Sequence, residues 1–140
     1  MYCFKLNDKG NVIRLYLYSY HYPLVWILPK QIGSLKHVKW ICLYNNTISQ
    51  IPKKIGKLKS LEILDLSKNS IKKIPIAIKK LKNLQNLDLS INQIKKIPRF
   101  FKNNPMLKKI DLLSNPVSKS RKLNSNSPAK FSSYKSFSEW

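Results

Sequence analysis

Three aspartates recur at a fixed spacing, and carboxylates in such a row could hold a metal ion or bind cationic groups. They are Asp65, Asp88 and Asp111, each 23 residues from the next, and together they make up half of the six acidic residues in the chain. If they occupy equivalent positions on neighbouring strands, about 4.8 Å would separate them. An open sheet offers little else to complete the shell of a metal, so we expect contact with basic groups of a partner and no metal site.

Other reactive side chains lack the partners that catalysis needs. His21 and His37 have no cysteine or carboxylate at the spacing of metal ligands, and the expected strand position of Cys42 brings no base beside its thiol. The chain has only three glycines, so a phosphate-binding loop is not expected either. The sequence therefore predicts no catalytic residue, no metal and no cofactor. Since the two cysteines, the other being Cys3, form no redox or disulfide motif, the expected compartment is the cytoplasm.

Aromatic residues are the other group that could recognise a partner. Tyr16, Tyr18, Trp40 and Tyr44 occur in the first third of the chain, at positions that should face outward from two expected strands. Exposed aromatic side chains on a rigid sheet are typical anchors of protein interfaces. The alternative is that these side chains pack on one another, or under the loop that follows the first strand.

A 23-residue repeat must position all of these side chains. The pattern L-x-x-L-x-L-x-x-N-x-I-x-x-I-P-x-x-I covers about 80 residues without a gap, and units begin near residues 12, 35, 58, 81 and 104. The first unit is about three residues longer and has Tyr20 or His21 where the others have asparagine. The apolar columns of the expected strands are Ile41, Leu64, Leu87 and Ile110, followed by Leu43, Leu66, Leu89 and Leu112.

The pattern predicts one short strand for each unit, with alternate side chains pointing inward. A buried asparagine column is tolerable only if each amide bonds backbone groups of the adjacent units. We expect this ladder from Asn46, Asn69, Asn92 and Asn115. The outward columns would be Arg14, Trp40, Ile63, Asn86 and Lys109; then Tyr16, Cys42, Asp65, Asp88 and Asp111; then Tyr18, Tyr44, Ser67, Ser90 and Leu113.

The units Leu35–Lys57, Leu58–Lys80 and Leu81–Asn103 resemble the leucine-rich-repeat superfamily, and more narrowly its 23-residue, proline-containing intracellular type seen in Ras-related scaffolds. The resemblance implies an α/β-class solenoid with short parallel strands on the concave face and a convex side rich in loops and 3₁₀ turns. It also implies protein binding along the concave face. In such a family the aspartate of a Leu-Asp-Leu-Ser segment is the commonest choice, which leaves open that the Asp row carries no functional information.

The two ends of the chain differ from the repeats. Residues 2–15 read as strand, turn and strand, so we expect a small hairpin that caps a solenoid of residues 1–117. Residues 118–140 are rich in Ser, Lys and Asn, which favours a disordered basic tail. However, Phe131, Tyr134, Phe137 and Trp140 recur every third residue and could instead pack loosely over the open end of the solenoid.

The chain has a formal net charge of +21, from 27 basic and 6 acidic residues. Such a charge attracts nucleic acids and anionic membrane surfaces, although a lysine-rich composition alone can produce it. The lysines fall mostly on loops and on the return side: Lys53, Lys54, Lys72, Lys73, Lys79, Lys80, Lys95, Lys96 and Lys108. The longest apolar stretch is too short to span a bilayer. We therefore expect a protein-binding module that is not an enzyme, with electrostatic binding of nucleic acid or anionic lipid as the alternative.

Overall fold

The structure is a computed structural model, and it describes residues 2–18, 27–103 and 107–117. The loop that contains Tyr20 and His21 lies outside these residues, and so does the C-terminal segment 118–140. The expectations for both segments therefore stay predictions.

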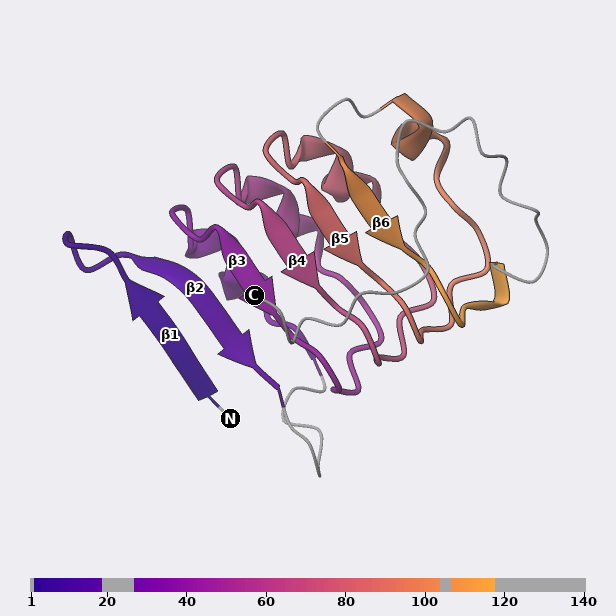
Figure 1. Cartoon of the computed structure of the whole chain (residues 1–140), viewed down its shortest axis with the longest axis horizontal. Coiled ribbons are helices and arrows are strands. Elements are labelled where there is room, and N and C mark those ends of the chain that lie inside the picture. The colour runs from indigo at the N-terminus through magenta and orange to yellow at the C-terminus, as the bar shows by residue number, and fades with distance from the viewer. Residues whose placement is uncertain (1, 19–26, 104–106, 118–140) are drawn as a thin grey trace.

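In the described part of the chain, six strands form one sheet in the order of the chain, as Figure 1 shows. The first two pair antiparallel as a hairpin, and each later strand pairs parallel with the one before it. A repeat with one strand per unit requires this arrangement. The chain of each unit must return to the end of the sheet where the strands start before the next strand begins. The strands are β1 (Tyr2–Leu6), β2 (Val12–Leu17), β3 (Trp40–Cys42), β4 (Ile63–Asp65), β5 (Asn86–Asp88) and β6 (Lys109–Asp111).

Short 3₁₀ turns return the chain behind the sheet (Figure 1). They are η1 (Lys30–Ser34), η2 (Lys53–Lys57), η3 (Ile76–Lys80) and η4 (Arg99–Asn103). A proline precedes each of the first three, and its fixed φ suits the extended entry to the turn. The predicted solenoid, with parallel strands on one side and 3₁₀ turns on the other, is confirmed. Within the described ranges, no helix is both long and apolar enough to cross a bilayer.

The strand register places residues 23 apart directly beside each other. Trp40 lies beside Ile63, and Cys42 lies beside Asp65, with the same pairing repeated along the sheet. The middle residues of β3 to β6 (Ile41, Leu64, Leu87 and Ile110) point into the core and are almost completely buried, whereas Leu15, the equivalent residue of β2, is partly buried. The three outward columns defined above therefore lie on one side of the sheet, and we call their residues the concave face.

The core is a stack of apolar side chains with one layer per unit. Side chains from the strands meet those from the turns, such as Ile55 and Ile78, and all are buried. No unit could bury its own apolar face, so the neighbouring units stabilise each other. The fully buried side chains include Ile41, Leu43, Ile48, Leu58, Leu61, Leu66, Ile71 and Leu81.

A ladder of asparagine amides joins each unit to the one before it. The amide nitrogen of Asn69 donates to the carbonyl of Leu43 in the preceding unit at 2.9 Å, and to that of Leu66 in its own unit at 3.0 Å. Its oxygen accepts the backbone N–H of Ile48 at 2.9 Å. Asn92 and Asn115 repeat both kinds of contact one and two units later. The amides thus satisfy buried backbone groups that the bend after each strand leaves without a partner.

The residue before each ladder asparagine adopts a left-handed backbone conformation. These residues are Asn45, Lys68, Ile91 and Ser114, with φ between 50° and 57°. Asparagine tolerates this region well, whereas a β-branched residue rarely adopts it. Since the conformation occurs at Ile91 as it does in the other units, the repeat geometry and not the local residue imposes it.

Neighbouring 3₁₀ turns approach each other closely at a glycine. A Cβ atom added to Gly56 would lie 2.8 Å from the carbonyl oxygen of Ala77, and one added to Gly33 would lie 2.7 Å from that of Lys54. Both contacts are shorter than packed atoms tolerate, so the absence of a side chain sets the spacing between these turns.

Candidate functional site

A compact aromatic cluster occupies the N-terminal part of the concave face. The rings of Tyr16, on β2, and Trp40, on β3, lie 5.6 Å apart at an angle of 56°. The guanidinium carbon of Arg14 lies 5.0 Å from the centroid of the Trp40 ring, within the range of a cation–π contact. Parallel pairing brings this about, because Arg14 lies beside Trp40 in the ladder.

The other two predicted aromatic residues follow the same strands. The ammonium of Lys68 lies 5.1 Å from the ring centroid of Tyr44. All four side chains, those of Tyr16, Tyr18, Trp40 and Tyr44, are partly buried, so they are only partly exposed, and Tyr16 and Trp40 pack on one another as the alternative expectation allowed. Contacts such as the tilted Tyr16–Trp40 pair explain this partial burial, since adjacent strands are close enough for large side chains to cover each other.

The indole nitrogen of Trp40 has no hydrogen-bond partner among the residues that the structure describes. The atom is buried, and no described residue supplies an acceptor for its hydrogen. Nearly every buried donor in proteins has a hydrogen-bond partner. A buried donor without an acceptor costs about 1–3 kcal/mol. An acceptor supplied from outside the described structure, with a small movement of the ring, would remove this cost.

The three aspartates do form a row across the sheet. However, each carboxylate accepts hydrogen bonds from the residue two positions later in the chain, just after its own strand. One carboxylate oxygen of Asp65 accepts the backbone N–H of Ser67 at 2.8 Å and its hydroxyl at 2.5 Å. Asp88 accepts the same two groups from Ser90, at 2.9 and 2.7 Å. Asp111 accepts the N–H of Leu113 at 2.9 Å. These bonds close a local turn after each strand, which gives the Leu-Asp-Leu-Ser segment a structural role.

The three aspartate side chains differ in how deeply they are buried, although an outward-facing column predicts that all three are exposed. Asp65 is only 1% exposed and Asp111 9%, whereas Asp88 is partly exposed. The second carboxylate oxygen of Asp88 makes no hydrogen bond with a described residue, so Asp88 is the member best able to receive an external group. Among the residues that the structure describes, no group of three or more His, Cys, Asp or Glu side chains is placed to hold a metal ion.

Desolvation dominates the electrostatics of this row. Burial, together with the neighbouring charge of Asp65, raises the pKa of Asp88 to about 6. Burial also raises the pKa of Asp65, although its bonds to Ser67 oppose the shift. The carboxylates of Asp65 and Asp88 therefore lower the stability of the folded chain when they are ionised without a cation nearby.

Cys42 is a poor nucleophile in this setting. Burial, with the adjacent Asp65 carboxylate, raises the pKa of the Cys42 thiol to about 12. The thiol donates to that carboxylate, with sulfur and oxygen 3.6 Å apart. A thiol held protonated in this way does not supply the thiolate that covalent catalysis needs.

The raised pKa of Asp88 predicts a pH-dependent stability. The folded chain binds the Asp88 proton more tightly than the unfolded chain, so this group stabilises the fold below about pH 4 and loses that effect as the pH rises through about 6. Asp88→Asn should therefore nearly match the wild type near pH 4 and be about 2–3 kcal/mol more stable near pH 8. Urea unfolding of both proteins across this range measures the difference. A difference that does not change with pH would contradict the prediction.

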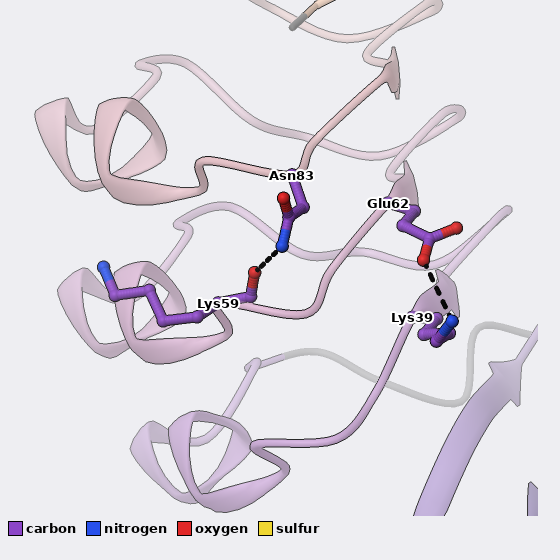
Figure 2. A network of polar contacts seen from close by, with 4 residues as sticks. All are labelled: Lys39, Lys59, Glu62 and Asn83. Carbon is purple, nitrogen blue, oxygen red and sulfur yellow. Dashed lines mark hydrogen bonds and ion pairs between the residues drawn. The ribbon is translucent and has the colours of Figure 1, made fainter.

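Separate polar contacts lie just before the strands and in the segments between the turns and the strands, as Figure 2 shows. Lys39 and Glu62 form an ion pair at 3.2 Å, and the amide of Asn83 donates to the carbonyl of Lys59 at 2.8 Å. Both partners of the ion pair are well exposed, so it contributes little to stability. It does neutralise Glu62, which leaves the Asp row as the main acidic feature around the sheet.

Comparison with known proteins identifies the repeat. The family described as Leucine-rich repeat region matches residues 25–126, which is more than half of the chain. This match does not distinguish the 23-residue intracellular type from other types. None of the curated proteins matches the sequence significantly.

Solved structures share the fold. A crystal structure of PEPR1–AtPEP1 has a TM-score of 0.71 and 31% identity over 80% of this chain. The protein LIC12759 of Leptospira interrogans has a TM-score of 0.64 and 29% identity over 86%. The ectodomain of the receptor kinase GASSHO1/SCHENGEN3 from Arabidopsis thaliana, in complex with CASPARIAN STRIP INTEGRITY FACTOR 2, has a TM-score of 0.58 and 31% identity over 63%. This chain covers only 16%, 36% and 11% of those three chains.

Proposed function

This chain belongs to the leucine-rich-repeat family, and we propose that it is a protein-interaction module that binds its partner across the concave face. The family match and the similar solved structures support a binding role in general. The position of the site on the concave face rests on the side chains found there.

The observation that carries the proposal is the unpaired indole of Trp40 inside an aromatic cluster. A partner that brings a carbonyl or carboxylate oxygen to its nitrogen would satisfy a buried donor that the described residues leave unpaired. The adjacent ring of Tyr16 and the nearby Tyr44 add apolar contact area on a rigid sheet. Aromatic residues that become fully desolvated in this way contribute most of the affinity of many interfaces.

The Asp row suggests which groups the partner presents to the rest of the face. A lysine or arginine near Asp88 would lower the pKa of its carboxylate and offset the cost of its burial. The proposed partner therefore presents basic side chains toward Asp88, while Asp65 and Asp111 mainly hold the strand ends. Aromatic anchors at one end and a carboxylate at the other would fix the direction in which the partner lies.

We propose no catalytic role for this face. The raised pKa of the Cys42 thiol, on the concave face, keeps it protonated near neutral pH. The identities of the partners of similar proteins do not transfer, because this chain covers a small part of each. The intracellular repeat type and a cytoplasmic location remain proposals that rest on the repeat spacing and the cysteine usage.

A pull-down with matched variants tests the proposal. The bait is the full chain, in nuclease-treated lysate at about 0.3 M salt, which screens exposed charges beyond several ångströms. A partner retained by the wild type should be lost by Tyr18→Ala/Trp40→Ala/Tyr44→Ala. Once it is identified, Trp40→Ala alone should weaken its binding by about 30-fold, which corresponds to about 2 kcal/mol.

The control carries three changes away from the concave face: Thr47→Ala/Ser49→Ala/Gln50→Ala, all at exposed positions. This control should bind like the wild type, and thermal melts should show that all variants fold. Equal binding of the aromatic variant and the wild type would rule out the concave face as the site.

A further inference from the structure

The side of the solenoid opposite the sheet is basic throughout the turns that the structure describes. None of η1 to η4 contains an acidic residue. Seven basic side chains in these turns are exposed, and none forms an ion pair with a described residue. They are Lys30, Lys53, Lys54, Lys57, Lys79, Lys80 and Arg99. We call this surface the turn face.

One apolar side chain projects from the turn face. Ile76 is the first residue of η3 and is 71% exposed, so it takes little part in the core. The two neighbouring turns, η2 and η4, begin with Lys53 and Arg99. Each of them therefore has a cation at the position that Ile76 occupies in η3. Packing within the described residues therefore gives little reason for an isoleucine at this exposed position between cations.

We propose that the turn face docks on the surface of an anionic lipid bilayer. The basic side chains would lie among the lipid phosphates and carboxylates, and Ile76 would enter the boundary between headgroups and acyl chains. Charge attraction combined with a shallow apolar insertion is the way in which peripheral proteins bind such membranes.

The same surface fits a single-stranded nucleic acid less well. Single-stranded nucleic acids bind basic surfaces that also offer aromatic rings for base stacking. In the described turns the aromatic residues are Phe100 and Phe101, which pack against each other with centroids 4.5 Å apart, and Phe101 is buried. Ile76 gives a base no stacking surface, whereas it suits a lipid interface.

The proposed contact would also orient the molecule. Asp65, Asp88 and Asp111 lie on the opposite side of the solenoid, where an anionic surface would not attract them. The bilayer would therefore leave the concave face pointing away from the membrane. This inference does not depend on the proposed protein-binding function, since it concerns a different surface.

Vesicle flotation of the full chain tests the proposal. The vesicles contain phosphatidylcholine alone, or phosphatidylcholine with about 30% phosphatidylserine, at about 0.1 M salt. We expect binding only to the anionic vesicles. Each basic residue near such a surface strengthens binding by about fivefold, so Lys53→Gln/Lys54→Gln/Lys57→Gln should weaken it by about 100-fold.

Two further variants separate the turn face from net charge. Lys72→Gln/Lys73→Gln/Lys95→Gln removes the same charge from exposed positions between the strands and the turns, and should weaken binding by less than about tenfold. Ile76→Ser keeps every charge and should weaken binding by about tenfold, as expected when an inserted isoleucine is lost. The concave-face variant Tyr18→Ala/Trp40→Ala/Tyr44→Ala should bind vesicles like the wild type, whatever the outcome of the pull-down.

Four outcomes would overturn the proposal. The first is no binding to anionic vesicles, and the second is equal binding to vesicles of phosphatidylcholine alone. The third is equal loss in the two lysine variants, which would mean that net charge alone attracts the chain. The fourth is a short single-stranded RNA that displaces the vesicles and binds the Ile76→Ser variant as tightly as the wild type, which would assign the turn face to nucleic acid.

Discussion

Asn69→Ala should lower the free energy of unfolding by about 4 kcal/mol, a large part of the stability of a small domain. The substitution leaves the buried N–H of Ile48 without its acceptor, which costs about 1–3 kcal/mol. It also removes the bonds to the carbonyls of Leu43 and Leu66, each worth about 1 kcal/mol. Those two carbonyls keep a second donor, from Asn46 and Asn92 respectively, which limits the loss.

Urea unfolding followed by circular dichroism measures this effect, with Asn83→Ala as the matched control. Asn83 is exposed and makes one bond, to the carbonyl of Lys59, so its loss should cost less than about 1 kcal/mol. If both variants lost similar amounts of stability, the ladder would not have the role that the structure gives it.

Gly56→Ala should lower the free energy of unfolding by about 2 kcal/mol. The added methyl group would lie 2.8 Å from the carbonyl oxygen of Ala77, so the η2 and η3 turns would have to move apart. Overpacking of this kind costs about 1–3 kcal/mol. Alanine would also restrict the unfolded chain, which stabilises by about 0.4–1 kcal/mol, and the clash should exceed that gain.

A thermal melt measures this change as a fall in Tm of roughly 5–10 °C. Ser49→Ala, at an exposed position on the same unit, is the control and should leave Tm almost unchanged. A Gly56→Ala variant as stable as the wild type would show that the two turns can separate without cost.

The repeat could be predicted from the sequence because its signal is redundant. A 23-residue period fixes which residues become neighbours, so Trp40 beside Ile63 and Asp65 beside Asp88 follow from counting alone. The stacking of one short strand per unit follows in the same way from the apolar columns, whereas the 3₁₀ turns were expected only from the resemblance to the leucine-rich-repeat superfamily. The spacing of Gly33 and Gly56 carried a further signal, a close approach of the turns, that a search for phosphate loops overlooks.

The properties of single side chains could not be predicted in this way. The position of a residue in the repeat predicts which way its side chain points, but not what fraction of that side chain its neighbours bury. The contacts of Arg14 with Trp40, and of Lys68 with Tyr44, depend on side-chain reach and make the aromatic cluster partly buried. The hydrogen bonds that the Asp65 carboxylate accepts from Ser67 depend on local turn geometry. The recurring Asp-Leu-Ser segment indicated that such bonds could form.

The direction of the asparagine ladder has a consequence for synthesis on the ribosome. Each ladder amide bonds the unit that precedes it, so Asn69 of the next unit supplies the acceptor for the N–H of Ile48 and the second donor for the carbonyl of Leu43. A unit that has just left the exit tunnel therefore keeps unpaired polar groups until about one more repeat has emerged. At about 5–20 residues per second, that interval is roughly 1–5 s for every unit. The nascent solenoid should thus always carry one incomplete coil at its growing end, exposed to chaperones and proteases until the following asparagine arrives.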